Sequence, residues 1–281
     1  MTFVGFGEAG SALAKPGDAC WDRLFDDPAA APLRRTAALD VEAFATAEAA
    51  LRDAEAVVSV VTADQALPAA RGYADLLRAG ALWLDFNSVS PGTKRAAATA
   101  VERCGARYVD VAVMAPVLPA ARDVPLLLSG PHAGAGLATL VDAGFGNVRV
   151  IDGPIGAAAA VKMVRSIMIK GIEALSAECI LAAEAAGVRE EVIASLDASR
   201  RDSGWETLFD YNLDRMMVHG RRRAAELDEV TTMLNELGLH DGLTRAAALR
   251  QRLVGELSIA PAEGLVAKLA QLTPVTKEMA A

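Results

Sequence analysis

A glycine-rich turn that follows a short apolar run constrains the fold of this chain more than any other feature. Gly5, Gly7 and Gly10 are spaced as G-x-G-x-x-G between the apolar residues 3–6 and the helix-forming residues 11–14. The first glycine permits a tight turn out of a strand, the second lets a pyrophosphate approach the backbone, and the third allows close packing of helix against strand. Between a strand and a helix, this spacing predicts a dinucleotide-binding turn. The residues expected to contact the dinucleotide are Gly5, Phe6, Gly7, Glu8, Ala9 and Gly10.

Short apolar runs alternate with helical patterns through the first half of the chain. The runs cover residues 3–6, 56–61, 82–86, 108–113, 124–128 and 148–151. Each run is short, continuous and bounded by turn residues, as is typical of strands buried on both faces of a sheet. Segments between them, such as 64–77 and 91–103, have helical spacing, and Ser90 with Pro91 is a favourable helix start. The alternation predicts an α/β fold with a Rossmann-type, doubly wound parallel sheet.

The pattern becomes helical after residue 152. One long helical pattern runs from residue 156 to about 186, where Gly187 supplies a stop. Four further helical segments follow, separated near Gly204, Gly220, Gly238 and Pro261. We predict a dinucleotide-binding domain over residues 1–152 and an all-helical domain over residues 153–281. The long helix is too apolar to stand alone, so we expect a homodimer formed through the helical domain.

Charge and composition exclude several classes of protein. The formal net charge of −8 argues against a nucleic-acid partner, because such partners usually require a basic face. Hydrophobic residues make up 53% of the chain, which suits a substantial core. The apolar stretch 157–161 is interrupted by Lys162 and Arg165, and no basic region of the signal-peptide type is present. We therefore expect a cytoplasmic protein without a membrane partner.

The three cysteines and three histidines do not form a metal-binding pattern. Cys20, Cys104 and Cys179 lie far apart, and their odd number fits a reducing compartment better than a disulfide framework. The histidines do not cluster with cysteine or acidic residues. The sequence thus predicts neither a metal site nor a Ser-His-Asp hydrolase.

The sequence leaves the choice between NAD and NADP open. An acidic residue that binds the ribose hydroxyls should fall about 20 residues beyond the glycine motif. Asp22 comes earlier, because residues 15–18 interrupt the first helix after little more than one turn. Asp22 would favour NAD, whereas Arg23, or Arg34 and Arg35, would hold the 2′-phosphate of NADP; alternatively, Asp22 and Arg23 are solvated loop residues. Two more residues are assigned to the cofactor site, Val61 and Thr62.

Lys162 is the strongest candidate for catalysis. It lies near the start of the long helix among small and apolar residues, at the predicted domain junction. A lone lysine here would usually be a surface residue, but a partly desolvated lysine can have a lowered pKa and serve as a general acid/base. Arg165 and Ser166, three and four residues on, share its helical face. Together the three side chains suit a small oxygenated anion.

These motifs resemble the β-hydroxyacid dehydrogenase family, which includes 3-hydroxyisobutyrate and 6-phosphogluconate dehydrogenases. The resemblance covers nearly the whole chain: the glycine turn, a D-x-S-T-x-x-P-like segment at 85–91, a glycine-rich junction, and K-x-x-x-N at Lys162. In the family, the lysine that Lys162 matches handles the proton of the substrate hydroxyl during hydride transfer. The residue that Ser88 matches lies near the nicotinamide ribose. The run 219–227 resembles a little-characterised, 6-phosphogluconate-dehydrogenase-like branch.

The departures from the family pattern concern substrate recognition. The family loop D-x-P-V-S-G-G binds the substrate carboxylate through its serine and glycines, and Met114, Ala115 and Pro116 stand in their place. Ser166 replaces the family asparagine. The resemblance therefore implies that the chemistry is retained and that substrate recognition is altered. The residues assigned to substrate binding are Met114, Ala115, Pro116, Arg165 and Ser166.

The main hypothesis is an NAD(P)-dependent oxidoreductase that moves hydride between the nicotinamide and a β-hydroxyacid-like alcohol or its carbonyl. Lys162 would be its general acid/base, and its partner a small anionic substrate. An imine reductase on the same scaffold is one alternative, against which Lys162 argues because imine reduction needs a different proton donor. A dinucleotide-binding protein without catalysis is another, which the short first helix and the altered substrate loop would fit.

Overall fold

The chain divides into two compact units in a computed structural model that describes residues 1–27, 31–199 and 204–278. The first unit covers Met1–Ile167 and the second Met168–Ala281. The relative placement of the two units is not determined. The domain boundary after residue 152 stays a prediction.

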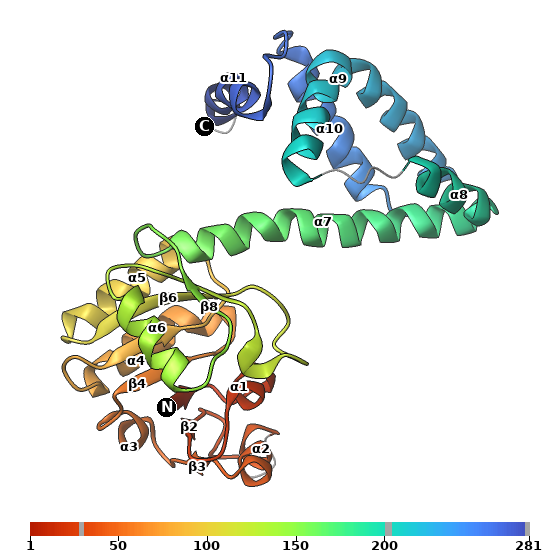
Figure 1. Cartoon of the computed structure of the whole chain (residues 1–281). Helices are drawn as coiled ribbons and strands as arrows, with labels where there is room; N and C mark the ends of the chain where they lie inside the picture. Colours follow the sequence, from red (N-terminus) through yellow and green to blue (C-terminus); the bar gives the residue numbers. More distant parts are fainter. Residues whose placement is uncertain (28–30, 200–203, 279–281) are drawn as a thin grey trace. The chain divides into compact units, whose positions relative to one another are not determined.

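The described part of the first unit contains an eight-stranded sheet (Figure 1). Its strands are arranged in the order β3-β2-β1-β4-β5-β6-β7-β8, and every neighbouring pair is parallel except the antiparallel pair β6 and β7. The strands are β1 (Thr2–Val4), β2 (Ala19–Trp21), β3 (Glu42–Ala43), β4 (Ala56–Ser59), β5 (Leu82–Asp85), β6 (Arg107–Val113), β7 (Leu126–Ser129) and β8 (Val148–Val150). The predicted α/β fold with a mostly parallel sheet is confirmed.

Helices cover both faces of this sheet. They are α1 (Glu8–Leu13), α2 (Ala31–Leu39), α3 (Ala47–Leu51), α4 (Ala66–Tyr73), α5 (Pro91–Arg103) and α6 (Ala133–Asp142). Successive strand residues enter opposite cores, because side chains alternate across a strand. Phe3 packs with α1 and α6 residues on one face, whereas Val4 packs with residues of α3, α4 and α5 on the other. Two buried apolar layers therefore hold the doubly wound sheet between its helices.

The short helix α1 fixes where Asp22 lies. Lys15, Pro16 and Gly17 follow α1 directly, and the chain enters β2 at Ala19. Asp22 is therefore the first residue after the carboxyl end of β2, the position of the ribose-binding acid in longer versions of this fold. The expectation that Asp22 comes too early for this position is wrong, because the shortened helix moves the whole strand forward. Its role in cofactor choice stays a prediction.

In the described residues of the second unit, all the regular elements are helices, joined by loops. This unit contains most of α7 (Ala157–Ala185), then α8 (Arg189–Ser199), α9 (Trp205–Glu236), α10 (Gly242–Glu256) and α11 (Leu265–Glu278). The predicted break near Gly220 is wrong, because α9 continues through this residue. A Cβ at Gly220 would lie 2.3 Å from the backbone oxygen of Gln251 and 2.9 Å from Cα of Gly255. Gly220 therefore serves close packing of α9 against α10 rather than a turn.

Alanine at two helical glycines is expected to change stability in opposite directions. Gly220→Ala should destabilise the second unit by about 1–3 kcal/mol, because the added methyl group must push α9 and α10 apart. Gly171→Ala, on α7, should stabilise it by about 0.5–1 kcal/mol, because a Cβ there meets no atom within 4 Å and alanine favours helix. Thermal unfolding of both variants measures the effect, and melting temperatures that move in the same direction would contradict this account of α9–α10 packing.

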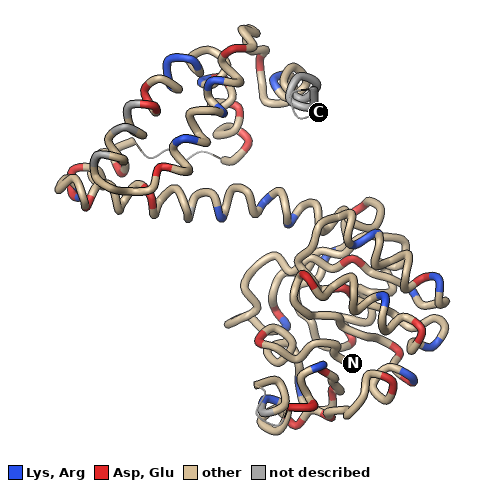
Figure 2. The backbone as a smooth tube through the Cα atoms, turned by 180° about the vertical axis from the view of Figure 1, so that it is seen from behind, with Lys and Arg blue, Asp and Glu red and all other residues tan. Residues whose placement is uncertain are grey.

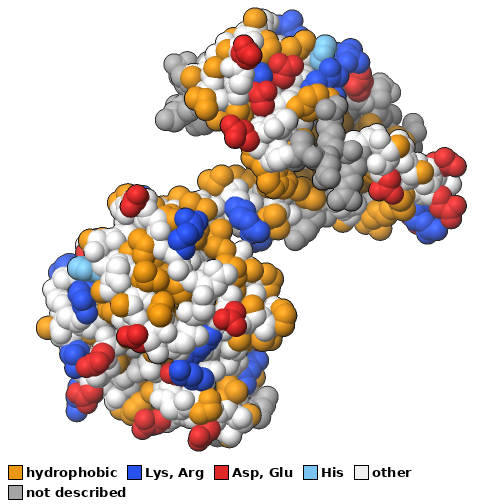
Figure 3. Space-filling model, viewed as in Figure 1, with side chains coloured by type: hydrophobic (Ala, Val, Ile, Leu, Met, Phe, Trp, Pro, Cys, Tyr) orange, Lys and Arg blue, Asp and Glu red, His pale blue; other side chains and the backbone are white. Residues whose placement is uncertain are grey.

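Helix α7 exposes large hydrophobic residues along its length (Figure 3). They include Val161, Val164, Ile167, Ile172, Leu175 and Leu181. Exposed apolar surface of this kind is typical of an interface, so it supports the expected homodimer, which stays a prediction. Among the described residues, no helix combines the length and apolar character that a membrane crossing needs.

Candidate active site

The three glycines of the turn between β1 and α1 have different structural roles. Gly5 has φ of +93°, and a Cβ there would lie 2.6 Å from the carbonyl oxygen of Val60 on the neighbouring strand connection. A Cβ on Gly10 would lie 2.4 Å from the carbonyl oxygen of Gly5. A Cβ on Gly7, by contrast, meets no atom within 4 Å. Gly5 and Gly10 are thus required by packing, whereas Gly7 leaves the space beside the turn open.

A cleft of about 430 Å³ lies at this turn. Most residues predicted to contact the cofactor line it: Gly5, Gly7, Glu8, Ala9, Asp22, Arg23, Val61 and Thr62. Phe6 and Gly10 are buried beneath the turn, and Ser88 lies on the loop after β5 and is not part of the lining. Eight of the predicted residues therefore border one cleft, and Phe6 and Gly10 lie beneath the turn that forms part of its wall.

Several residues of the cleft were missed in the sequence. Trp21 at the end of β2 makes an edge-on ring contact with Tyr73 of α4, with ring centroids 5.1 Å apart. Gln65, Pro68 and Tyr73 line one wall. Their spacing is helical, so it could have indicated a common face once residues 64–77 were assigned as a helix.

Asp22 and Arg23 are both held by hydrogen bonds in this cleft. The carboxylate of Asp22 accepts from the backbone N–H of Phe6 at 2.7 Å and of Leu24 at 2.9 Å. The guanidinium of Arg23 donates to Oε1 of Gln65 at 3.0 Å. Asp22 is thus tied to the glycine turn, whereas Arg23 is exposed in the loop after β2, so its part in cofactor binding stays a prediction. Arg35 is half-buried on α2, and the side chain of Arg34 lies outside the described residues.

The cleft fits the pyrophosphate of a dinucleotide. Helix α1 begins after Gly7, which has no side chain to cap it, so the first-turn N–H groups face the space that Gly7 leaves open. Such N–H groups, together with the helix dipole, favour an anion. Glu8 lies in this turn as well, and its side chain is exposed.

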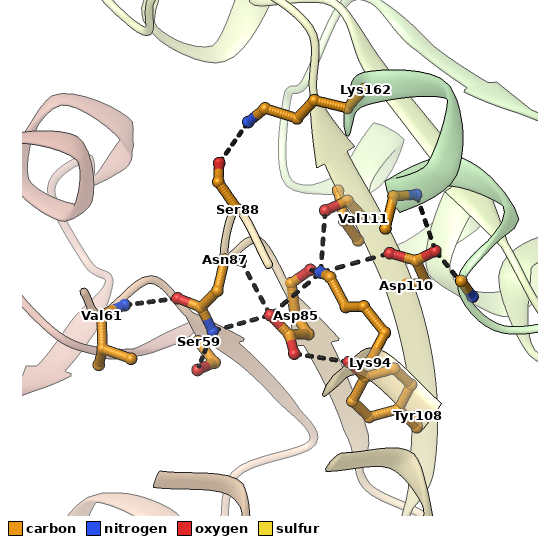
Figure 4. A network of polar contacts seen from close by, with 12 residues as sticks. Ser59, Val61, Asp85, Asn87, Ser88, Lys94, Tyr108, Asp110, Val111 and Lys162 are labelled. Carbon is orange, nitrogen blue, oxygen red and sulfur yellow. Dashed lines mark hydrogen bonds and ion pairs between the residues drawn. The ribbon is translucent and has the colours of Figure 1, made fainter. Parts of the chain in front are cut away.

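A buried polar network supports the next strand connection (Figure 4). Asn87 follows β5, and its Oδ1 accepts from the backbone N–H of Val61 at 2.7 Å. Its Nδ2 donates to Ser59 at 3.0 Å and to Asp85 at 2.7 Å. Asn87 thus ties the loop that carries Ser88 to the wall of the cleft. Asn87 and Asp85 were not predicted as site residues, although both lie in the segment that resembles the family motif.

The residues predicted for catalysis and substrate binding meet beside this loop. The ammonium of Lys162 donates a hydrogen bond to Oγ of Ser88 (Figure 4). Arg165 donates to the carbonyl oxygen of Met114 at 3.3 Å, which brings the altered substrate loop to the same helix. Ser166 donates to the carbonyl oxygen of Lys162 at 2.9 Å, so its hydroxyl proton is directed to its own helix. Ala115 and Pro116 are exposed beside Met114. All these residues belong to the first unit.

Comparisons with known proteins agree with this site. Residues 1–135 match the family described as the NAD binding domain of 6-phosphogluconate dehydrogenase, and residues 183–254 match a domain of unknown function, DUF1932. A solved structure of a conserved hypothetical protein from Sinorhizobium meliloti 1021 is 33% identical, covers 98% of this chain and 94% of its own, and has a TM-score of 0.59. Residues 1–135 therefore belong to the 6-phosphogluconate-dehydrogenase-like family of NAD-binding domains, and the whole chain is related to the Sinorhizobium meliloti protein. This member of the family is an NAD(P)-dependent oxidoreductase, and its N-terminal domain binds NAD or NADP.

More distantly related solved structures share the fold of this chain. An imine reductase from Myxococcus stipitatus in complex with NADP+ is 20% identical, with 96% of this chain and 98% of that one covered and a TM-score of 0.70. A 3-hydroxyisobutyrate dehydrogenase from Mycobacterium tuberculosis is 17% identical, with 92% of each chain covered and a TM-score of 0.59.

In the described part of this chain, no group of three or more His, Cys, Asp or Glu side chains is placed to hold a metal ion.

Proposed function

We propose that this oxidoreductase transfers hydride between NAD(P) and a β-hydroxyacid-like alcohol or its carbonyl, with Lys162 as the general acid/base. The observation that carries the proposal is the hydrogen bond from Lys162 to Ser88. It holds an ammonium group beside the loop after β5, at the carboxyl end of the sheet, where ligands of open α/β sheets bind. The resemblance of Lys162 and Ser88 to the family's acid/base and ribose-side residues agrees with this arrangement.

Each group has a distinct task in the proposed reaction. When bound, the nicotinamide exchanges hydride with the substrate carbon. In the direction of oxidation, neutral Lys162 accepts the proton that leaves the substrate hydroxyl, and in the direction of reduction the ammonium returns it to the carbonyl oxygen. Ser88 orients the lysine by accepting its hydrogen bond. A proton donor at a fixed position avoids the need to recruit one from water.

Substrate recognition is proposed to depend on positively charged side chains of α7 more than on hydrogen bonds from the loop at residues 114–116. The first turns of α7 carry Lys162 and Arg165 and no acidic residue up to Ile167 (Figure 2). The exposed guanidinium of Arg165 can pair with a carboxylate of the substrate while its other edge holds Met114. Ser166 can accept a hydrogen bond from the substrate, since its own proton is already donated. Met114, Ala115 and Pro116 would then border the substrate with apolar surface.

A turnover panel with both cofactors tests the proposed reaction. We expect β-hydroxyacids to be oxidised with NAD+ or NADP+, and uncharged alcohols to react at least about tenfold more slowly because they cannot pair with Arg165. Cyclic imines with NADH or NADPH form the second arm. Turnover of imines without turnover of hydroxyacids would establish the imine-reductase alternative. Cofactor binding with no turnover in either arm would favour a binding protein without catalysis.

Arg23→Ala is expected to discriminate between the two cofactors. The arginine lies in the cleft directly after Asp22, so its removal should weaken NADP(H) binding by about tenfold, the loss of about 1.4 kcal/mol expected for a charge-assisted contact. NAD(H) binding should change by no more than about twofold. Calorimetric titration with both cofactors measures the difference. Equal effects on the two would show that Arg23 does not contact a 2′-phosphate, and Arg52→Ala, at an exposed site on the same unit, is the matched control.

A further inference from the structure

A fully buried lysine on α5 contacts the two strands β5 and β6. Lys94 of α5 is 0% exposed, and its ammonium lies 3.2 Å from Oδ1 of Asp85 and 3.3 Å from Oδ1 of Asp110 (Figure 4). It also donates to the carbonyl oxygens of Asp85, at 2.5 Å, and Val111, at 3.4 Å. Asp85 and Asp110 are register partners on the neighbouring strands β5 and β6. The lysine therefore forms ion pairs with two adjacent buried carboxylates.

The first carboxylate leads to Ser88. Oδ1 of Asp85 accepts from the backbone N–H of Asn87 at 2.8 Å and from its Nδ2 at 2.7 Å. Oδ2 accepts from the hydroxyl of Tyr108 at 2.5 Å. Burial, and then the charge of Asp85, raise the pKa of Tyr108 well above its usual value, so the phenol keeps its proton and remains a donor. Asp85 thus holds Asn87, whose chain neighbour is Ser88.

The second carboxylate leads to Lys162. Oδ2 of Asp110 accepts from the backbone N–H of Gly156 at 3.0 Å and of Ala159 at 3.1 Å, and from the hydroxyl of Ser129 at 2.9 Å. These bonds fix the first turn of α7, and Lys162 follows one turn later. Oδ1 of Asp110 makes no hydrogen bond with the described residues. The ion pair with Lys94 at 3.3 Å therefore stabilises this oxygen of the carboxylate.

We propose that Lys94 is a positioning residue that sets the distance between Ser88 and Lys162. Its single charge draws together Asp85, which holds the Ser88 loop, and Asp110, which holds the start of α7. Buried ion pairs contribute little net stability compared with apolar packing, so geometry is the better reason for a lysine here. The inference rests on the proposed function of Lys162 but concerns a different residue.

The test follows the Lys162 side chain without substrate. The chain has six lysines, and reductive methylation with 13C-formaldehyde labels those that are accessible. The resonance that disappears in Lys162→Arg is that of Lys162. Ser88→Ala gives the position of that resonance when the hydrogen bond is absent. We expect Lys94→Gln to move the Lys162 resonance toward the Ser88→Ala position. Lys15→Gln, the same change at an exposed lysine, should leave it in place.

Asp110→Asn keeps the test decisive if Lys94→Gln does not fold. It removes the second ion pair but leaves an oxygen that can accept from Gly156 and Ala159, and Lys94 stays paired with Asp85. We expect the Lys162 resonance to move in this variant too. A folded variant of either kind with the wild-type Lys162 resonance would show that Lys94 only neutralises buried charge, and the inference would fail.

A kinetic measurement adds a readout that a purely structural role would not change. With a substrate from the turnover panel and saturating cofactor, Lys94→Gln should lower kcat by about tenfold. Its KM for the cofactor should stay within about threefold of the value for the unmodified chain. In a Ser88→Ala background, the further loss should be much smaller, because both changes disturb the same contact. Full additivity would contradict action through Ser88. Unchanged activity in Lys162→Met would instead refute the proposed function and leave the resonance test standing.

Discussion

Lys162→Met is expected to lower kcat by about 10²- to 10⁴-fold, the contribution usually made by a positioned general acid or base. Methionine keeps the length and apolar stem of lysine and removes the ammonium that donates to Ser88. The proton of the substrate hydroxyl must then be exchanged with water, without a fixed partner. Steady-state rates with the best substrate of the panel measure the loss. The dissociation constant of NAD(P)(H) should stay within about threefold, since Lys162 does not line the cofactor cleft.

Lys170→Met is the matched control for this variant. Lys170 is exposed on the same helix, and the substitution removes the same charge and the same number of donors. Its kcat should remain close to that of the unmodified chain. If Lys162→Met and Lys170→Met retain equal rates, the acid/base assignment is wrong and another group must exchange the proton. If Lys162→Met also loses cofactor binding, its effect belongs to the cleft rather than to proton transfer.

The strands that were found in the sequence are those with continuous apolar runs. All six predicted runs correspond to strands of the sheet, and in all of them except β8 the strand residues are almost entirely buried, which leaves an uninterrupted apolar signal. Strand β2 was missed because its three residues lie between Asp18 and Asp22, and β3 because it has only two residues. β3 is exposed and contains Glu42, so its sequence resembles a loop. Both strands are specified by hydrogen bonds to their neighbours in the sheet, which a local pattern does not contain.

The candidate site could be predicted where a local pattern determines it. The glycine turn, Lys162 and Ser88 each lie in a recognisable segment, and the structure brings Lys162 and Ser88 together. Lys94 was missed, because a lysine in the first turn of a helix usually faces solvent. Its burial depends on Asp85 and Asp110 being register partners, and this becomes visible only once β5 and β6 are adjacent. Gly220 shows the same limit, since a glycine required by helix packing looks like a helix break in the sequence.

Gly7→Val is expected to raise the dissociation constant of NAD(P)(H) at least about tenfold, equivalent to a loss of about 1.4 kcal/mol, without unfolding the first unit. A Cβ at this position meets no protein atom within 4 Å, so the fold has room for the side chain. The valine would fill the open space beside the first turn of α1, where the pyrophosphate is expected to approach the N–H groups. Quenching of Trp21, which lines the same cleft, reports the binding.

Gly134→Val is the control for this last variant. Gly134 lies on α6 of the same unit, and a Cβ there also meets no atom within 4 Å, so both substitutions add the same side chain in open space. Only Gly7→Val should weaken cofactor binding, while both variants should keep a melting temperature near that of the unmodified chain. Undiminished affinity in Gly7→Val would place the pyrophosphate elsewhere. The packing of Gly5 and Gly10 would then explain the turn without a ligand, because their contacts with Val60 and with each other already require glycine.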